Sequence, residues 1–269
     1  MNIREIFGID LPIIQAPMAG VQGSELAVAV SSAGGLGSLP CAMLGTDQLR
    51  HELATIREQT TKPVNVNFFC HGQPRHCEQS DRTWRAALAP YYEELGVDPE
   101  SVPAGPGRLP FGKDALEVLE EFRPEVVSFH FGLPSPDLLS RVKDWGARIL
   151  SSATTVEEAL WLEANGADAV IAQGVEAGGH RGHFLSTDLE KQMGTFALVP
   201  QVVQAVDLPV IAAGGISDTR AVSAAMILGA AGVQVGTAYL LCDEARTSEV
   251  HRAALKSDAA RNTALTNVF

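Results

Sequence analysis

The feature that most constrains this fold is a repeated unit: a short apolar segment, a turn marked by Gly or Pro, and an amphipathic segment with helical spacing. The apolar segments are near-continuous runs of Val, Ile and Ala, a pattern typical of parallel strands buried on both faces. Eight such strands are predicted, at Pro12–Ala16, Gly35–Leu39, Val64–Phe69, Val126–His130, Ala147–Ser151, Ala169–Ala172, Pro209–Ala213 and Gly232–Gly236.

Capping residues predict helices between these strands. Ser24, Thr155 and Asp218 each precede a segment with helical spacing, and Gly146 and Gly229 follow others. Ser, Thr and Asp side chains accept hydrogen bonds from the free N–H groups at a helix start, and Gly suits the left-handed turn at a helix end. The eight strand–helix units predict an α/β protein with a (β/α)8 TIM barrel. A doubly wound open sheet is the alternative, because the pattern does not reveal strand order.

One unit is much longer than the others. The segment between the third and fourth predicted strands runs from about Cys70 to Arg123. A connection this long inside a compact domain is usually functional. We therefore expect a barrel made of residues 1–70 and 123–269 and an inserted lid subdomain, residues 71–122, with helices near Ser80–Leu95 and Lys113–Phe122. The alternative is a surface excursion that supports oligomerisation.

The charge balance and the apolar segments restrict the partners. The chain of 269 residues carries 20 Lys and Arg against 32 Asp and Glu, a formal net charge of −12. This balance argues against nucleic acid, whose binding needs a basic surface. The longest apolar stretch is broken by Ser223, Gly229 and Gly232, so no membrane span is predicted, and the first residues lack the apolar run of a signal peptide. We expect a cytoplasmic enzyme with a small-molecule substrate, and a homodimer stays open.

The cysteines give little sign of a disulfide framework or a metal. The four of them, at positions 41, 70, 77 and 242, form no CxxC motif. Cys70, His71, His76 and Cys77 place four zinc-ligand types close together, but their spacing fits no standard finger or ribbon. We therefore predict a loop without a metal, with structural zinc as the alternative.

The stretch from Ala172 to Gly182 places a single imidazole, that of His180, on a loop rich in Gly directly after a predicted strand. Gly allows a backbone to approach a ligand closely, and barrel enzymes carry their chemistry on the loops that follow their strands. His180 is therefore the candidate catalytic residue. The alternative is a Gly-rich turn with a solvated histidine.

Two Gly-rich loops follow the last two predicted strands. They contain Ala213-Gly214-Gly215 and Gly236-Thr237. In barrels, this pair of loops and the start of the following helix form the usual phosphate site, because small residues let backbone N–H groups converge on an anion. We expect a ligand that carries a phosphate.

Other strand-end residues indicate the rest of this ligand. Asn67 and Gln173 place amides in otherwise apolar runs, and Met18 follows the first strand. Such groups suit a flat heterocycle with N and O atoms on its edge. No Lys stands at a predicted strand end, which disfavours a Schiff-base aldolase, and no Asp/Glu/His trio has the spacing of a metal-dependent enolase or hydrolase.

Taken together, motifs along essentially the whole chain resemble the flavin-dependent nitronate monooxygenases of the class I type, formerly called 2-nitropropane dioxygenases. They are Ile14–Gly20, Val64–Phe69, Ser128–Gly132, Gln173–Gly182, Ala213–Ile216 and Val233–Thr237. The resemblance implies a barrel that binds FMN without a covalent bond. It places the FMN against Ala16, Pro17, Met18, Asn67, Gln173, Gly178, Gly179, Ala213, Gly214, Gly215, Gln234, Gly236 and Thr237.

The resemblance also implies the reaction: oxidation of an alkyl nitronate, with propionate 3-nitronate as the expected substrate, by O2 to a carbonyl compound and nitrite or nitrate. His180 would be the active-site histidine, with His130 as a second catalytic candidate or a hydrogen-bonded structural residue. Because a nitronate is already an anion, His180 would hold the nitro oxygens; on a neutral nitroalkane it could remove the α proton.

Related activities stay open at this point. Flavin-dependent enoyl-ACP reductases share the barrel and a similar Ala-Gly-Gly-His loop, and an NAD(P)H:quinone reductase is a further alternative. A barrel that binds flavin or another phosphate ligand without catalysis is the alternative of another class. IMP dehydrogenase fits less well, since no Cys lies between Gln173 and Phe184. Asn67, His130 and Arg181 favour the nitronate enzymes, although members of that family usually continue beyond the stretch at positions 266–269.

Overall fold

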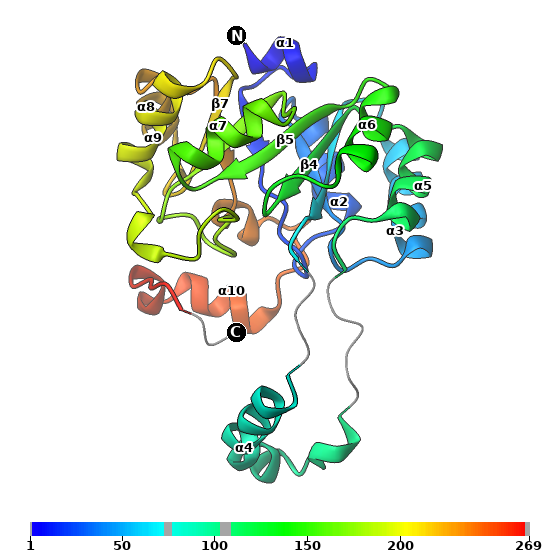
Figure 1. The fold of residues 1–269 in the computed structure, drawn as a ribbon, viewed down its shortest axis with the longest axis vertical. Helices are drawn as coiled ribbons and strands as arrows, with labels where there is room; N and C mark the ends of the chain where they lie inside the picture. Colours follow the sequence, from blue (N-terminus) through cyan, green and yellow to red (C-terminus); the bar gives the residue numbers. More distant parts are fainter. Residues whose placement is uncertain (1, 73–76, 103–108, 267–269) are drawn as a thin grey trace.

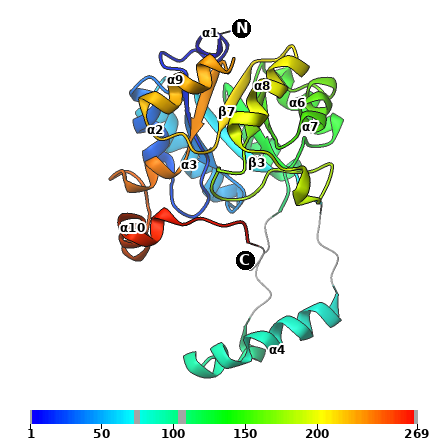
Figure 2. The same ribbon diagram turned by 90° about the vertical axis from the view of Figure 1, so that its left-hand side faces the viewer.

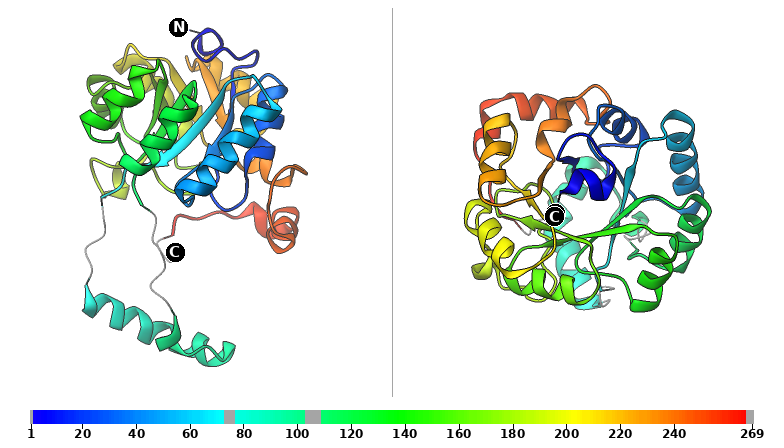
Figure 3. Two further views of the ribbon diagram at one scale, coloured as in Figure 1. Left: turned by 90° about the vertical axis from the view of Figure 1, so that its right-hand side faces the viewer. Right: turned by 90° about the horizontal axis from the view of Figure 1, so that it is seen from above.

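The computed structural model describes residues 2–72, 77–102 and 109–266. Its strands form one sheet in the order β1-β8-β7-β6-β5-β4-β3-β2, and every neighbouring pair is parallel. A parallel bridge between Ile14 and Leu36 joins the two ends of this sheet. The chain is therefore a (β/α)8 TIM barrel (Figure 3), as predicted, rather than an open sheet. The strands are β1 (Ile13–Gln15), β2 (Gly37–Pro40), β3 (Val64–Phe69), β4 (Val126–His130), β5 (Arg148–Ala153), β6 (Ala169–Gln173), β7 (Val210–Ala213) and β8 (Gly232–Val235).

Helices surround the strands, as the view along the barrel in Figure 3 shows. Two of the predicted capping residues act where expected: the Thr155 side chain accepts from the Glu158 N–H, and the Asp218 side chain accepts from the Ala221 N–H. The prediction for Ser24 is wrong, because Ser24 is the first residue of its helix and Gly23 precedes it as the N-cap, without a side-chain hydrogen bond. Gly146 follows a helix with φ of 86°. The surrounding helices are α2 (Ser24–Ser32), α3 (Thr46–Gln59), α5 (Lys113–Phe122), α6 (Pro136–Asp144), α7 (Val156–Ala164), α8 (Thr195–Ala205) and α9 (Thr219–Ile227).

The two ends of the barrel are covered differently. The short helix α1 (Ile3–Phe7) buries Ile3 and Phe7 against Ile14, Leu150 and Ile211, which fills the end where the strands begin. Helix α10 (Glu249–Lys256) lies at the opposite end, and Figures 1 and 2 agree on this placement. The carboxyl ends of the strands, where barrel enzymes bind their substrates, therefore face α10.

The inserted segment contains α4 (Glu78–Leu95) and the 3-10 turn Pro99–Ser101. Helix α4 has no buried residue, and Figures 1 and 2 draw it apart from the barrel, on the same side as α10. Helix α5, which the sequence analysis groups with the insertion, packs beside α3 and α6 in the surrounding ring, with Leu116 and Leu119 fully buried. The division of the chain into a barrel and a lid stays a prediction.

The insertion leaves and rejoins the barrel at neighbouring points. The Phe111 N–H donates to the Phe69 carbonyl over 2.8 Å, and the rings of Phe68 and Phe111 lie with centroids 4.8 Å apart. Phe111 is itself buried in the core between β3, β4 and the surrounding helices. The two ends of the insertion are thus held together where the chain leaves β3.

The structure shows neither a cluster of metal ligands nor a membrane-spanning helix among the residues it describes. Within the ranges that the structure describes, no three His, Cys, Asp or Glu side chains gather as a metal site. Of the predicted zinc alternative, His76 lies outside those ranges, while Cys70 is partly buried and Cys77 exposed. The helices of the described residues are all too short or too polar to cross a membrane.

Candidate active site

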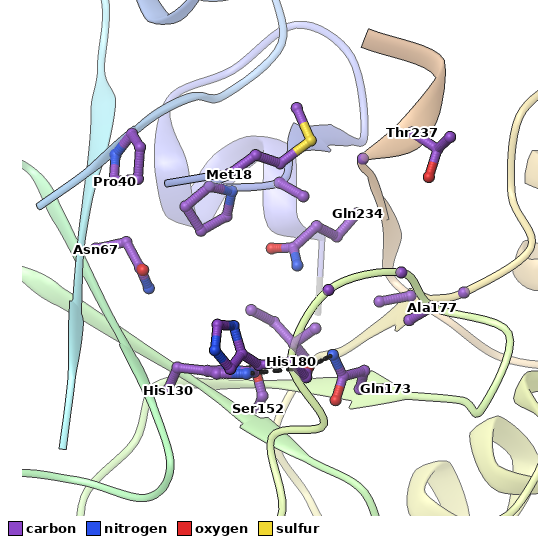
Figure 4. A pocket seen from close by; sticks show the side chains of 18 of the residues that line it. Met18, Pro40, Asn67, His130, Ser152, Gln173, Ala177, His180, Gln234 and Thr237 are labelled. Carbon is purple, nitrogen blue, oxygen red and sulfur yellow. Dashed lines mark hydrogen bonds between the residues drawn. The ribbon is translucent and has the colours of Figure 1, made fainter. Parts of the chain in front are cut away.

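A cavity of about 530 Å³ opens at the carboxyl ends of the strands. It is formed by the chain just after β1, β6, β7 and β8 and by the ends of β2, β3, β4 and β5. The structure brings every predicted catalytic and cofactor-binding residue to this one cavity, and Figure 4 shows part of the lining. The residues are His130, His180, Ala16, Pro17, Met18, Asn67, Gln173, Gly178, Gly179, Ala213, Gly214, Gly215, Gln234, Gly236 and Thr237.

The Gly-rich turn after β7 is one that larger residues could not form. Gly214 and Gly215 have φ of 120° and 68°, in the region that L side chains rarely adopt. A Cβ on Gly214 would lie 2.6 Å from Thr195 Oγ1 and 2.9 Å from the Ala177 backbone nitrogen. The turn lines the cavity and leads directly into α9, whose first N–H groups have no partner within the helix. This corner of the cavity is suited to an anion.

Amide side chains face the cavity from opposite walls. On β3, Asn67 is buried and its Nδ2 donates to Ser128 Oγ over 2.9 Å, which fixes the orientation of the amide. On β8, Gln234 also lines the cavity, and its Oε1 is buried without a hydrogen-bond partner among the described residues. A buried acceptor that lacks a donor costs free energy, so a ligand N–H at this position would stabilise the site.

His130, the last residue of β4, is held in one protonation state. Its Nε2 lies 3.3 Å from the His180 carbonyl oxygen, and its Nδ1 lies 3.0 Å from Ser152 Oγ. Because a carbonyl can only accept, Nε2 carries a proton, and in the neutral ring Nδ1 then accepts from the Ser152 hydroxyl. Burial lowers the pKa of His130 to about 4. The imidazole is therefore neutral at pH 7 and cannot act there as a cationic group.

His180 lies on the loop after β6, and its side chain is exposed to the cavity. Its ring approaches Phe69 with a centroid distance of 5.5 Å and Phe131 with one of 6.0 Å, both edge to face. Phe131 is one of the two described residues other than Gly with a positive φ, 69°. The imidazole thus stands against an aromatic wall and points toward the open space in Figure 4.

A buried arginine anchors the same loop from behind. Arg181 is 9% exposed and does not line the cavity. Its guanidinium donates to the carbonyls of Gln173 and Gly174 over 2.9 Å and 2.7 Å and to Gln192 Oε1 over 2.8 Å. The residue after the catalytic candidate is therefore a structural brace for the end of β6.

A buried carboxylate holds the following stretch. Glu158, on α7, accepts from the backbone N–H and hydroxyl of Thr154 and from the N–H groups of Phe184 and Leu185, over distances of 2.7 to 3.2 Å. Glu158 is 1% exposed. The loop that carries His180 is thus fixed to the barrel wall on its far side.

Sequence reasoning missed several residues that line the cavity. Ser128 and Ser152 are polar residues within apolar strands, the signal that identified Asn67, but they were not singled out. Phe69 resembles an ordinary core residue in the sequence. His251 comes from α10 and carries no local signal, since only the fold brings it to the cavity.

Comparison with known proteins decides the family. The family model described as nitronate monooxygenase matches residues 2–269. The chain belongs to this family. It is 45% identical over 268 residues to a nitronate monooxygenase of Paraburkholderia phytofirmans, covering 97% of this chain and 72% of the relative. It is 46% identical to a nitronate monooxygenase of Pseudomonas aeruginosa, covering 98% and 76%. These relatives make the chain an oxidoreductase whose family oxidises nitronates.

Solved structures agree with the fold. A nitroalkane oxidase from Streptomyces ansochromogenes has a TM-score of 0.90 at 39% identity, over 99% of this chain and 76% of that one. A mutant of FabK from Thermotoga maritima has a TM-score of 0.72 at 30% identity, over 94% and 69%. The enoyl reductase domain of MlnA from Bacillus amyloliquefaciens, at 16% identity and a TM-score of 0.64, shares the fold alone. The barrel is thus common to several families.

Proposed function

We propose that this protein binds FMN in the cavity and oxidises alkyl nitronates, such as propionate 3-nitronate, with O2, giving a carbonyl compound and nitrite or nitrate. One observation supports the proposal most strongly. The cavity combines an anion-suited corner at Gly214–Ser217, an unsatisfied acceptor on Gln234 and an exposed imidazole on His180. A phosphate, a planar ring with an N–H edge and an anionic substrate would each find a matching group.

The residues present fit FMN. The cradle after β7 accepts only Gly at position 214, which leaves the backbone accessible to a phosphate. The Gln234 Oε1 would accept from an N–H on the ring edge, and Asn67 and Met18 would line the ring. When bound, FMN supplies the redox chemistry between the nitronate and O2. The protein supplies position and electrostatics.

His180 is the residue that would contact the substrate. A nitronate carries its negative charge on two oxygens, and an N–H of an exposed imidazole can donate to them. His130 is neutral and has both ring nitrogens in hydrogen bonds, so it would not compete as a base. On this arrangement, Gln173 and the Gly residues 178 and 179 contribute mainly through the path of the loop.

The overall reaction balances in two ways. One O2 per nitronate gives a carbonyl compound and nitrate; one O2 for two nitronates gives two carbonyl compounds and two nitrites. Measuring O2 consumption together with both anions therefore distinguishes the routes. No other oxidant is required.

A direct test uses the purified protein. Its absorbance spectrum should show bound flavin, and HPLC of the released cofactor should give FMN. Propionate 3-nitronate should drive O2 uptake, and NADH or NADPH should not bleach the flavin under anaerobic conditions. Bleaching by a nicotinamide without nitronate-driven O2 uptake would instead identify a reductase, and a coloured protein inert to both substrates would identify a flavin-binding protein without this activity.

We also propose that α4 acts as a lid on this cavity. Helix α4 lies on the side where the cavity opens, and it exposes Trp84 and Tyr91 by 52% and 60%. Closure would bury these rings and exclude water from the site. Trp84 fluorescence should then change when a nitronate binds, measured in a Trp145→Phe/Trp161→Phe variant in which Trp84 is the remaining Trp. An unchanged Trp84 emission at saturating nitronate would reject the lid.

A further inference from the structure

We propose that Gln173 is a positioning residue that holds His180 over the cavity by binding the backbone on both sides of Arg181. Gln173 ends β6 and is 7% exposed. The Nε2 and Oε1 atoms of its amide point toward the loop that follows, as Figure 4 shows for its bond to His180. The role is distinct from contact with a cofactor, because it acts through the chain.

Both ends of the Gln173 amide are engaged with this loop. The Nε2 donates to the His180 carbonyl over 2.9 Å, and the Oε1 accepts from the Gly182 N–H over 2.7 Å. The side chain thus hydrogen-bonds to the irregular backbone of residues 180–182 as the backbone of a neighbouring strand would. Buried hydrogen bonds of this kind favour one backbone conformation over its alternatives.

Two further groups complete the clamp. The His180 carbonyl also accepts from His130 Nε2, so it carries two donors from different strands. The Arg181 guanidinium binds the carbonyl of Gln173 itself, which fixes the base from which the amide extends. Of the two hydrogen bonds described to the His180 carbonyl, the one from Gln173 is the shorter, at 2.9 Å against 3.3 Å.

The two residues that precede His180 in the chain are both Gly. Gly178 and Gly179 precede it, and Gly179 has φ of 75° with no atom within 4 Å of an added Cβ. Gly residues adopt many backbone conformations at similar free energy. The Gln173 amide, which binds the backbone at His180 and Gly182, therefore restrains the backbone path here more closely than the two Gly residues do.

The first test measures the His180 ring directly. In the FMN-loaded protein, the ring resonances of His180, assigned with His180→Asn, should be single and sharp. Gln173→Met, which keeps the side-chain length but removes both hydrogen bonds, should broaden or split them. The exposed Gln201→Met on α8 is the matched control and should leave them unchanged. An unaltered His180 resonance in folded Gln173→Met would overturn the proposal.

The second test rests on the proposed function and uses a double-mutant cycle. Gln173→Met should lower kcat/KM for propionate 3-nitronate by about tenfold at saturating FMN, and by less than about twofold in the His180→Asn background. Equal factors in both backgrounds would show that Gln173 does not act through His180. If the protein does not oxidise nitronates at all, the proposed function fails, while the ring measurement still decides the role of Gln173.

Discussion

Gly182 is the position where a single methyl group should do most damage to the site. An added Cβ would lie 2.6 Å from His130 Cε1, 3.1 Å from His130 Nδ1 and 3.0 Å from Ser152 Cβ. Real Cβ atoms do not approach carbon this closely, so the His130 ring must move. Its movement breaks the bonds to Ser152 and to the His180 carbonyl.

The magnitude follows from the overpacking and from the loss of these two hydrogen bonds. Overpacking costs about 1–3 kcal/mol and each lost hydrogen bond about 0.5–1.5 kcal/mol, so Gly182→Ala should lower the free energy of unfolding by roughly 2–6 kcal/mol. For a chain of this size, each kcal/mol lowers Tm by about 2–4 °C. Activity should fall further than stability alone explains, because the displaced ring no longer supports His180.

The assay is thermal and urea unfolding of the FMN-loaded protein together with nitronate-driven O2 uptake at a temperature well below Tm. Gly45→Ala is the matched control, since its φ is −71° and no atom of the described residues lies within 4 Å of an added Cβ there. A Gly182→Ala variant with the Tm and turnover of the control would refute the reasoning that His130 is held against this backbone.

Three further outcomes are expected. Burial lowers the pKa of His130 from 6.5 to about 4, so between these pH values the unfolded chain binds more protons than the folded one. The free energy of unfolding should therefore fall as the pH drops from about 6.5 to 4, by at most about 1.4 kcal/mol per pH unit. Urea unfolding of His130→Gln at the same pH values should lack this decrease. Cys77 is exposed, and hydrogen bonds from Ser80 lower its pKa, whereas burial raises the pKa of Cys41. A thiol reagent should therefore label Cys77 first, as detected by mass spectrometry, and early labelling of Cys41 would contradict this. Glu158→Gln turns one buried acceptor into a donor facing N–H groups and should cost about 2–4 kcal/mol in urea unfolding, so a loss below about 1 kcal/mol would be inconsistent with the contacts described.

The sequence predicted the barrel and the gathering of the site residues for one physical reason. In a parallel barrel the carboxyl ends of all strands meet at one rim, so a residue placed at a strand end is also placed at the site. Val64–Phe69 and Val126–His130 were predicted with their observed bounds, and Asn67 and His130 follow from them.

Other parts of the site depend on geometry that no local pattern carries. The Arg181 side chain follows the catalytic candidate in sequence, yet it turns away from the cavity to bind carbonyls at the end of β6. The double acceptance by the His180 carbonyl requires side chains from two strands to meet over a loop. His251 reaches the cavity only because α10 lies across that end of the barrel. Such contacts depend on rotamers and loop paths, which the pattern of apolar residues does not determine.

The hydrogen bond between Phe69 and Phe111 has a consequence for how this protein can vary. It joins the two points where the inserted segment leaves and rejoins the barrel, and the buried Phe111 ring secures the junction. The strands on either side are therefore insensitive to the number of residues between these points, since doubling a loop adds only about 0.6 kcal/mol of closure entropy. We therefore expect that the insertion can be shortened or replaced while the strand ends beneath it keep their geometry.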